Sequence, residues 1–122
     1  MGHVFDDVKD TLPVSGDGYD AQIIREIKAC VIDLTTSTEI VLPGEVNITR
    51  TLVPATQSTP AYWTITDTST LDDEFVITVI SIWCNLRIGN PPNYDQLLRA
   101  YNSYKGQMRL SKTYTSSGVT TE

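Results

Sequence analysis

The pattern of apolar residues predicts a helix over residues 71–89 that is covered on several sides. Apolar side chains recur there at three- and four-residue intervals, which is the spacing of a helix face. Thr70 suits the N-cap position, and the acidic residues 72–74 complement the free amide groups of the first turn. Arg87 and Gly89 suit the C-terminal end. The pattern consists of Phe75, Val76, Val79, Ile80, Ile82, Trp83 and Leu86, widened by Ile77 and Ile88.

Two further helical patterns lie near the N-terminus. The first is short, runs from Val4 to Leu12 and is stopped by Pro13. The second, Asp20–Leu34, follows the i, i+3, i+4, i+7 pattern of an amphipathic helix. Asp17 or Asp20 can cap this second helix.

A last helix is predicted after the turn at residues 90–92. Asn93 and Gln96 have the spacing of a capping box. An apolar stripe from Tyr94 to Met108 follows, and the chain becomes polar after Leu110. We expect the helix to end there.

Residues 35–70 differ in composition from the helical segments on either side. They contain eleven threonines, and three prolines exclude a long helix. Apolar or aromatic residues often alternate with threonine, which predicts strands over Glu39–Leu42, Val46–Val53 and Tyr62–Thr66. Such an excursion either covers the helical core as a small sheet or offers edge strands to another chain, and we favour the second interpretation.

Together these segments predict a mainly α fold. We expect a small bundle of three to four helices with a long strand-containing insertion between the second and third helices. The chain has 122 residues, 40% hydrophobic and 20% charged, which suits one globular domain. We place this domain at residues 1–110, with the 35–70 excursion inside it. Residues 111–122 are expected to form an extended C-terminal tail that is loose in an isolated subunit.

Charge is divided unevenly along the chain. The net charge of −6 argues against binding that depends on neutralising phosphates. Residues 1–84 hold thirteen acidic and four basic residues, whereas residues 85–122 hold two acidic and five basic ones. Such blocks are compatible with ordinary solvated surface, and they also suit subunits that meet head to tail. No run of eighteen apolar residues occurs, so we expect no association with a membrane.

The sequence offers no constellation for catalysis. His3 is the only histidine, and no cysteine or carboxylate surrounds it at metal-ligand spacing. There is no glycine-rich phosphate loop or nucleophile motif, and the acids 72–74 point around a helix instead of converging on an ion. Cys30 and Cys84 fall on apolar helix faces and are expected to be buried free thiols. We expect no enzymatic activity, no cofactor and no metal.

The last helix leaves one alternative function open. Aromatic and basic residues together can stack on single-stranded nucleic acid, and a small DNA-binding regulator would also be helical. Tyrosines at helical spacing are more often core or interface residues, and the first two-thirds of the chain are acidic. A helical regulator that uses the basic C-terminal helix is therefore the alternative. The residues concerned are Tyr94, Tyr101, Tyr104, Arg99, Lys105 and Arg109.

The order of elements along the chain matches a known pattern. A short helix and proline precede an acidic turn and helix, DGYDAQIIREIKACVIDL. After the excursion come an apolar helix, LDDEFVITVISIWCNLRIGN, and a last helix, YDQLLRAYNSYKGQMRL, with Pro92 at set spacing from Leu97, Leu98 and Tyr101. Over about four-fifths of the chain, this order resembles the head-to-tail connector (adaptor) proteins of long-tailed bacteriophages.

The resemblance implies a structural virion protein. Such connectors form a ring, typically a dodecamer, beneath the portal protein of the filled capsid, and they receive a stopper (head-completion) or tail-side protein. The implied partners are further copies of the chain, the portal and that tail-side protein, while DNA passes through the lumen without sequence-specific binding. The implied location is the head–tail interface or neck of the virion, after synthesis in the bacterial host cytoplasm.

Candidate partner-binding residues come from three parts of the chain. Tyr62 and Trp63 on the excursion and Tyr114 on the tail are candidate aromatic anchors. On the central helix, Ile77, Ile80 and Ile88 are expected to remain for a second surface, part of which would be a subunit interface. The other side of that helix, Phe75, Val79, Trp83 and Leu86, is expected to pack on Ile23, Ile27, Val31, Leu97 and Tyr101. The basic residues Arg99, Arg109 and Lys112 complete the candidate set.

Overall fold

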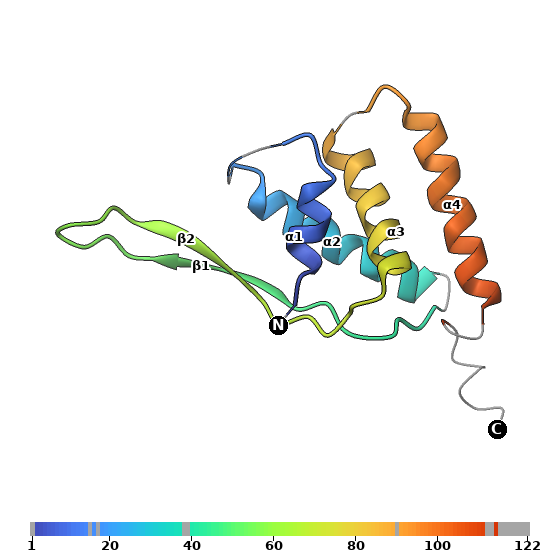
Figure 1. Cartoon of the computed structure of the whole chain (residues 1–122), viewed down its shortest axis with the longest axis horizontal. Helices are drawn as coiled ribbons and strands as arrows, with labels where there is room; N and C mark the ends of the chain where they lie inside the picture. Colours follow the sequence, from blue (N-terminus) through green and yellow to red (C-terminus); the bar gives the residue numbers. More distant parts are fainter. Residues whose placement is uncertain are drawn as a thin grey trace.

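Four helices and one β-hairpin make up the described part of the chain (Figure 1). The structure, a computed structural model, describes residues 2–14, 16, 18–37, 40–89, 91–111 and 114. The predicted class, a mainly α bundle with a strand-containing insertion between the second and third helices, is confirmed. The elements are α1 (Val4–Asp10), α2 (Asp20–Ile32), β1 (Ile48–Val53), β2 (Tyr62–Asp67), α3 (Glu74–Cys84) and α4 (Tyr94–Leu110), and π-helical turns, Asp33–Ser37 and Asn85–Gly89, follow α2 and α3.

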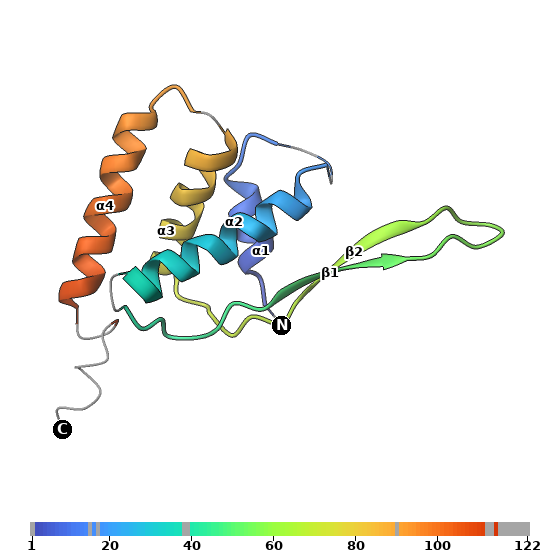
Figure 2. The ribbon, with the colours of Figure 1, turned by 180° about the vertical axis from the view of Figure 1, so that it is seen from behind.

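Helix α3 is the centre of the helical body. It lies between α1 and α4, and α2 crosses it on a further side (Figures 1 and 2). Its residues Val76, Val79, Ile80 and Cys84 have no exposed surface. Because three other helices pack against it, α3 needs apolar side chains around most of its circumference. This arrangement explains why its sequence pattern is wider than a single stripe.

The start of α3 differs from the predicted one. Asp73, and not Thr70, is the N-cap residue, and its carboxylate accepts a hydrogen bond from the N–H of Val76 at 3.1 Å. The hydroxyl of Thr70 instead accepts a hydrogen bond from the N–H of Glu45 at 2.8 Å. Thr70 therefore ties two loop segments together, and the closer acid satisfies the first turn of the helix.

The prediction of a free second surface is wrong, because Ile88 is partly buried against the core, and Ile77 and Ile80 are buried within it. Their exposed fractions are 7% and 0%. The short helix α1 packs against α3, and its apolar residues Val4, Phe5 and Val8 belong to the same buried core. The additional apolar side chains of α3 are therefore buried within the chain, because they pack against the apolar side of α1.

Two residues predicted to cap helices, Asp20 and Asn93, make no side-chain cap hydrogen bond among the described residues. Tyr19 is the N-cap residue of α2 and makes no side-chain cap bond, while the carboxylate of Asp20 lies 2.6 Å from the ammonium of Lys9. Asp17 lies outside the described residues. At α4 the N-cap residue is Asn93, as expected, but its side chain makes no cap hydrogen bond, so the reciprocal capping box is absent.

The strands β1 and β2 form an antiparallel hairpin, and within the described residues they pair only with each other. They correspond to two of the predicted strands, although β1 begins at Ile48 and not at Val46. The strand predicted over Glu39–Leu42 is not formed. Glu39 lies outside the described residues, and residues 40–42 contribute a single bridge at Ile40.

Asp67 ties the base of the hairpin to the N-terminal segment. Its carbonyl accepts a hydrogen bond from the N–H of Gly2 at 3.1 Å, and its carboxylate accepts one from the N–H of Phe5 at 2.9 Å. Burial alone would raise the pKa of Asp67, but the hydrogen bonds from Phe5 and Ser69 hold that pKa below its usual value. The hairpin therefore leaves the helical body from an anchored base.

None of the helices in the described residues combines the length and the apolar character needed to cross a membrane.

Candidate partner-binding site

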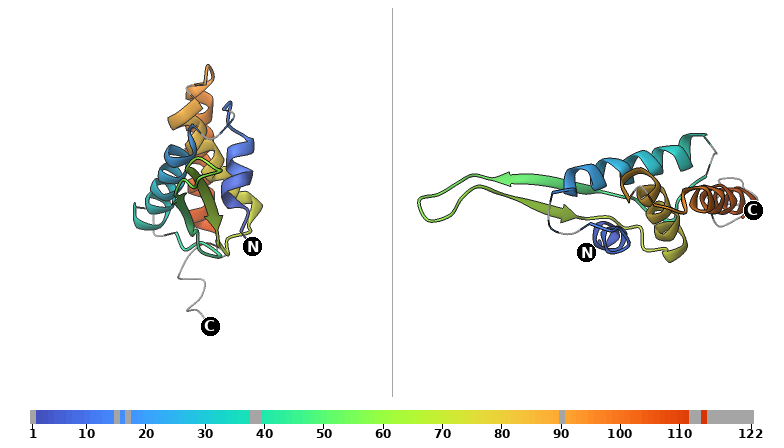
Figure 3. Two further views of the ribbon diagram at one scale, coloured as in Figure 1. Left: turned by 90° about the vertical axis from the view of Figure 1, so that its left-hand side faces the viewer. Right: turned by 90° about the horizontal axis from the view of Figure 1, so that it is seen from above.

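The hairpin projects from the helical body as an arm (Figures 1 and 3). We use "arm" for residues 48–67. Leu52, Tyr62 and Trp63 in its outer half have exposed fractions of 48%, 49% and 46%. Large apolar side chains gathered on an exposed, projecting element are typical of an interaction surface. The structure therefore places two of the predicted aromatic anchors, Tyr62 and Trp63, together on the arm.

The strand register sorts the side chains of the arm onto two faces. Residues directly opposite each other in an antiparallel pair point to the same side of the sheet. Leu52 lies opposite Trp63, and the next pair, Val53 and Tyr62, points to the other side. The outer end of the arm is therefore apolar on both faces. Closer to the body, one face carries Arg50 with Ile65, and the other carries the pairs Thr49–Thr66 and Thr51–Thr64.

Arg50 is the only charged residue between positions 49 and 66. Its guanidinium carbon lies 3.9 Å from the centre of the Trp63 ring, which is a cation–π contact. Its Nε atom is buried and has no hydrogen-bond acceptor among the described residues. A buried donor without an acceptor costs free energy, so the arm holds one polar atom that is not satisfied within the described residues.

Local sequence explains why the arm forms. Threonine and apolar residues alternate along the strands and favour extended backbone. Between the strands, the N–H of Thr56 donates to the Thr59 carbonyl at 2.8 Å, and the N–H of Thr59 donates to the Thr56 hydroxyl at 3.1 Å. Pro54 and Pro60 flank this turn and have no N–H for a further ladder bond.

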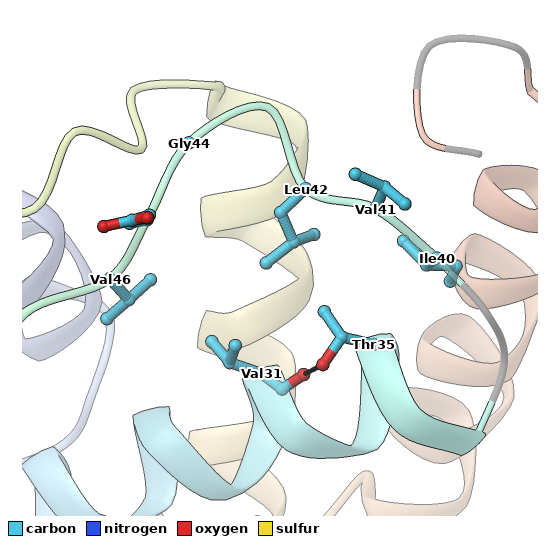
Figure 4. A pocket seen from close by; sticks show the side chains of 8 residues that line it. Val31, Thr35, Ile40, Val41, Leu42, Gly44 and Val46 are labelled. Atoms are coloured by element: carbon cyan, nitrogen blue, oxygen red, sulfur yellow. Dashed lines mark hydrogen bonds between the residues drawn. The ribbon is translucent and has the colours of Figure 1, made fainter. Parts of the chain in front are cut away.

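An apolar groove lies beside the C-terminal end of α2 (Figure 4). Its volume is about 500 Å³. Val31 and Thr35 form the helical wall, and Leu42 and Val46 face them from the segment that leads to β1 (Figure 4). The Thr35 hydroxyl donates to the Val31 carbonyl at 2.8 Å, so this polar group is already satisfied. The groove therefore offers two largely apolar walls.

The chain in front of α3 holds the outer wall of the groove in place. The carbonyl of Glu45 accepts hydrogen bonds from the N–H groups of Thr70 and Leu71 at 2.9 and 3.0 Å. Gly44 has a φ of 149°, and a Cβ there would lie 2.7 Å from the Leu71 Cα, so glycine is required. The exposed carboxylate of Glu45 has no hydrogen bond or ion pair among the described residues.

Tyr114 packs on the helical body. Its exposed fraction is 9%, and its ring stacks on Phe75 with 6.0 Å between the ring centres. Its hydroxyl donates to the carboxylate of Asp73 at 2.8 Å, and its carbonyl accepts from the N–H of Val41 at 2.7 Å. Burial and Asp73 raise the pKa of Tyr114 to about 12. The third predicted anchor is thus used within the chain and is not available to a partner in this structure.

The basic residues of α4 fall into two groups. Arg99 and Arg109 are exposed and make no ion pair among the described residues. Lys105 lies 2.9 Å from the carboxylate of Asp33, which also accepts a hydrogen bond from the Tyr101 hydroxyl at 2.7 Å. Burial would raise the pKa of Asp33, but these two donors hold it below its usual value. Lys112 lies outside the described residues.

Sequence reasoning missed the position of His3. Its Nδ1 contacts the carboxylate of Asp7 on α1, and its Nε2 lies 2.6 Å from the carboxylate of Asp72 in front of α3. The i, i+4 spacing of His3 and Asp7 is a local signal for the first contact, but no local signal could reveal the second, because Asp72 is remote in sequence. The described ranges contain no group of three His, Cys, Asp or Glu residues arranged to hold a metal ion.

The arguments for function come from the molecule itself, because no protein-family model, curated protein or solved structure matches the chain. Three features of the molecule need explanation: the arm with its apolar end, the groove beside α2, and the unequal charges of α1 and α4.

Proposed function

We propose that the chain is the subunit of a head-to-tail connector ring in a long-tailed bacteriophage. The ring lies beneath the portal in the neck of the virion, joins the DNA-filled capsid to the stopper or tail, and performs no catalysis. The observation that carries the proposal is the projecting arm, whose strands pair only with each other in the described part of the chain.

An isolated two-stranded hairpin is a marginal structure in water. Each strand of the arm has an edge that can pair with another chain. Leu52, Tyr62 and Trp63 also leave apolar surface exposed at its outer end. An assembly of repeated subunits gives every arm a partner that can bury this surface. The arm therefore supports a structural role in assembly.

Helices α1 and α4 lie on opposite sides of α3 and carry opposite charges (Figure 1). Helix α1 has three acidic residues and one lysine, whereas α4 has three basic residues and one acid. Two different, complementary flanks allow head-to-tail contact between copies, and such contacts close into a ring when the rotation between subunits permits it. A dodecamer is the ring size that the resemblance implies.

The acidic balance of the chain suits passage of DNA through a lumen. With a net charge of −6, a ring of these subunits would have little tendency to grip DNA by neutralising its phosphates. The partners in this proposal are other copies, the portal protein and a stopper or tail-side protein. DNA then passes through without sequence-specific contacts.

The test is assembly with the portal protein of the same virus. Native mass spectrometry and particle imaging should show rings of the chain stacked on the portal. A variant in which a short Asn-Gly turn replaces residues 51–64 should keep the helical circular dichroism of the wild type and lose the rings. Persistent monomers that do not bind the portal would contradict the proposal.

A gel-shift experiment distinguishes the connector from the alternative function, a small DNA-binding regulator that uses the basic C-terminal helix. A regulator should retard duplex DNA with an affinity that falls steeply as salt rises, whereas a connector subunit should not. Lys105 is already paired with Asp33, so a regulator would depend on Arg99 and Arg109 within the described part of α4. Salt-dependent retardation that is lost in the variant carrying both Arg99→Ala and Arg109→Ala would favour the regulator.

A further inference from the structure

We infer that the outer end of the arm of one subunit docks in the groove beside α2 of the next copy. This inference rests on the proposed ring and names one of its contacts between subunits. The arm contributes Leu52, Tyr62 and Trp63, and the groove contributes Val31, Leu42 and Val46.

The shape of the arm fits a groove better than a flat surface. Because Leu52 and Trp63 point to one face and Tyr62 points to the other, burying all three side chains requires walls on two sides. The groove has two such walls, one from α2 and one from residues 40–46 (Figure 4). Its volume of about 500 Å³ lies within the ~300–1,000 Å³ of ligand-enclosing pockets, which leaves room for large side chains.

The positions of the two features favour a second copy as the occupant. The arm extends away from the body on the α1 side, whereas the groove lies at the end of α2 that is nearer to α4 (Figures 1 and 2). A strand of six residues spans roughly 20 Å, so the arm reaches well beyond its own helices. Contact between two different patches on opposite sides of a subunit repeats from copy to copy and can close a ring.

Charge complementarity supports the same pairing. Residues 49–66 of the arm carry Arg50 and no acid, so their net charge is +1. Because the whole chain has a net charge of −6, the remaining residues together have a net charge of −7. Within the described residues, the Nε of Arg50 has no acceptor, and the carboxylate of Glu45 beside the groove has no partner. Docking brings the guanidinium group of Arg50, which makes no ion pair among the described residues, and an unpaired carboxylate to the same interface, where a charge-assisted hydrogen bond is stronger than in water.

Cysteine cross-linking tests this contact directly. The double variant Ala61→Cys with Thr35→Cys, which keeps the apolar contact residues of arm and groove, should form a ladder of disulfide-linked multimers when the protein is oxidised in the presence of the portal. An equal mixture of the two single variants should give linked dimers. The matched control combines Ala61→Cys with Ser103→Cys, an exposed position on α4, and should give no ladder. Wild-type protein, whose two cysteines are buried, sets the background.

Charge reversal gives a second measurement. Arg50→Glu should weaken assembly at least tenfold, and Glu45→Arg in the same chain should restore most of the loss. A disulfide confined to single chains would show that the arm folds back on its own groove, and equal linkage at Ser103 would show random collision. Either result would overturn the inference.

The two proposals fail in different ways. Portal-bound rings without the Ala61–Thr35 linkage would overturn the docking and leave the connector function standing. Linkage between copies without portal-bound rings would support the docking and contradict the connector function. If neither rings nor linkage formed, both proposals would be wrong.

Discussion

The guanidinium group of Arg50 lies over the indole ring of Trp63, 3.9 Å from its centre, on the exposed arm. Arg50 lies opposite Ile65 and Trp63 lies opposite Leu52, and these two pairs follow each other on the same face of the hairpin. This contact holds a large aromatic ring in place before any partner arrives, so less side-chain entropy remains to be lost on binding. The arm therefore presents a partly preorganised surface.

Trp63→Ala should weaken assembly without unfolding the helical body. Because Trp63 is 46% exposed, its removal should lower the free energy of unfolding by less than about 1 kcal/mol, chiefly through the lost cation–π contact. Assembly of the subunits into a ring should weaken ~30-fold or more, which is the loss expected when the Trp63 side chain is an interface hot spot. Urea denaturation and native mass spectrometry measure the two effects.

Thr66→Ala, an exposed position on the opposite face of the arm, is the control for Trp63→Ala. It should change neither assembly nor stability appreciably. A loss of several kcal/mol of stability in Trp63→Ala would mean that the arm supports the body, contrary to the role in assembly.

The helices could be predicted from the sequence because their signals are local. The spacing of Ile23, Ile24 and Ile27 marks the inner side of α2 without reference to any other segment. The partner of each apolar side could not be predicted in the same way. Ile77 and Ile80 have no free surface because α1, far away in the sequence, shares the core with α3. Register and packing between distant segments are not encoded in local spacing.

For the same reason, only part of the candidate partner-binding site could be predicted from the sequence. Tyr62 and Trp63 stand out in the sequence as aromatic residues within threonine-rich strands. The groove cannot be recognised in the sequence, because its walls come from separate segments: Val31 belongs to α2 and Val46 to a loop. The close approach of Gly44 to Leu71 sets the position of that loop. Such a surface exists only once the chain has folded.

Substitutions at Ile80 should act on the core and not on a partner. Its side chain has no exposed surface, so Ile80→Val should cost about 0.5–1.5 kcal/mol and Ile80→Ala about 2–5 kcal/mol of unfolding free energy. Ile80→Asp would bury an unpaired carboxylate and should prevent folding. The control is Ile32→Ala, at a position that is 61% exposed, which should stay within ~0.5 kcal/mol of wild type. A mild effect of Ile80→Ala in urea denaturation would contradict this core.

Asp73 should couple the start of α3 to Tyr114. One carboxylate oxygen caps α3 through Val76, and the other accepts the Tyr114 hydroxyl. Tyr114→Phe should cost about 1 kcal/mol, and Asp73→Ala should cost more, about 2 kcal/mol, because it also removes the cap. Tyr114→Phe should cost much less in the Asp73→Ala background, as a double-mutant cycle by urea denaturation will measure. Strictly additive effects would be inconsistent with this bond.

Stability should fall as pH rises through the pKa of His3. Hydrogen bonds to Asp7 and then Asp72 raise this pKa above 6.5, so the charged imidazole stabilises the fold fully below about pH 6.5 and the contribution is lost above the raised pKa. Asp33 and Asp67 have lowered pKa values and lose their contributions only in acid, outside this window. NMR titration of the single histidine gives the pKa, and His3→Gln should abolish this pH dependence. An imidazole that titrates at or below 6.5 would refute the linkage.

The two thiols should resist alkylation until the protein unfolds. Cys30 and Cys84 have no exposed surface, and burial raises the pKa of Cys30 to about 12 and moves the pKa of Cys84 in the same direction. At pH 8 a thiol of pKa ~12 is ionised in only ~10⁻⁴ of molecules, and the thiolate is the reactive form. Iodoacetamide should therefore label neither residue quickly in native protein and both in guanidinium, as mass spectrometry will show. Ser103→Cys, exposed on α4, is the control and should react at once. Rapid native labelling of Cys30 would mean that the helices do not enclose it, because only opening of the core can bring reagent to that thiol.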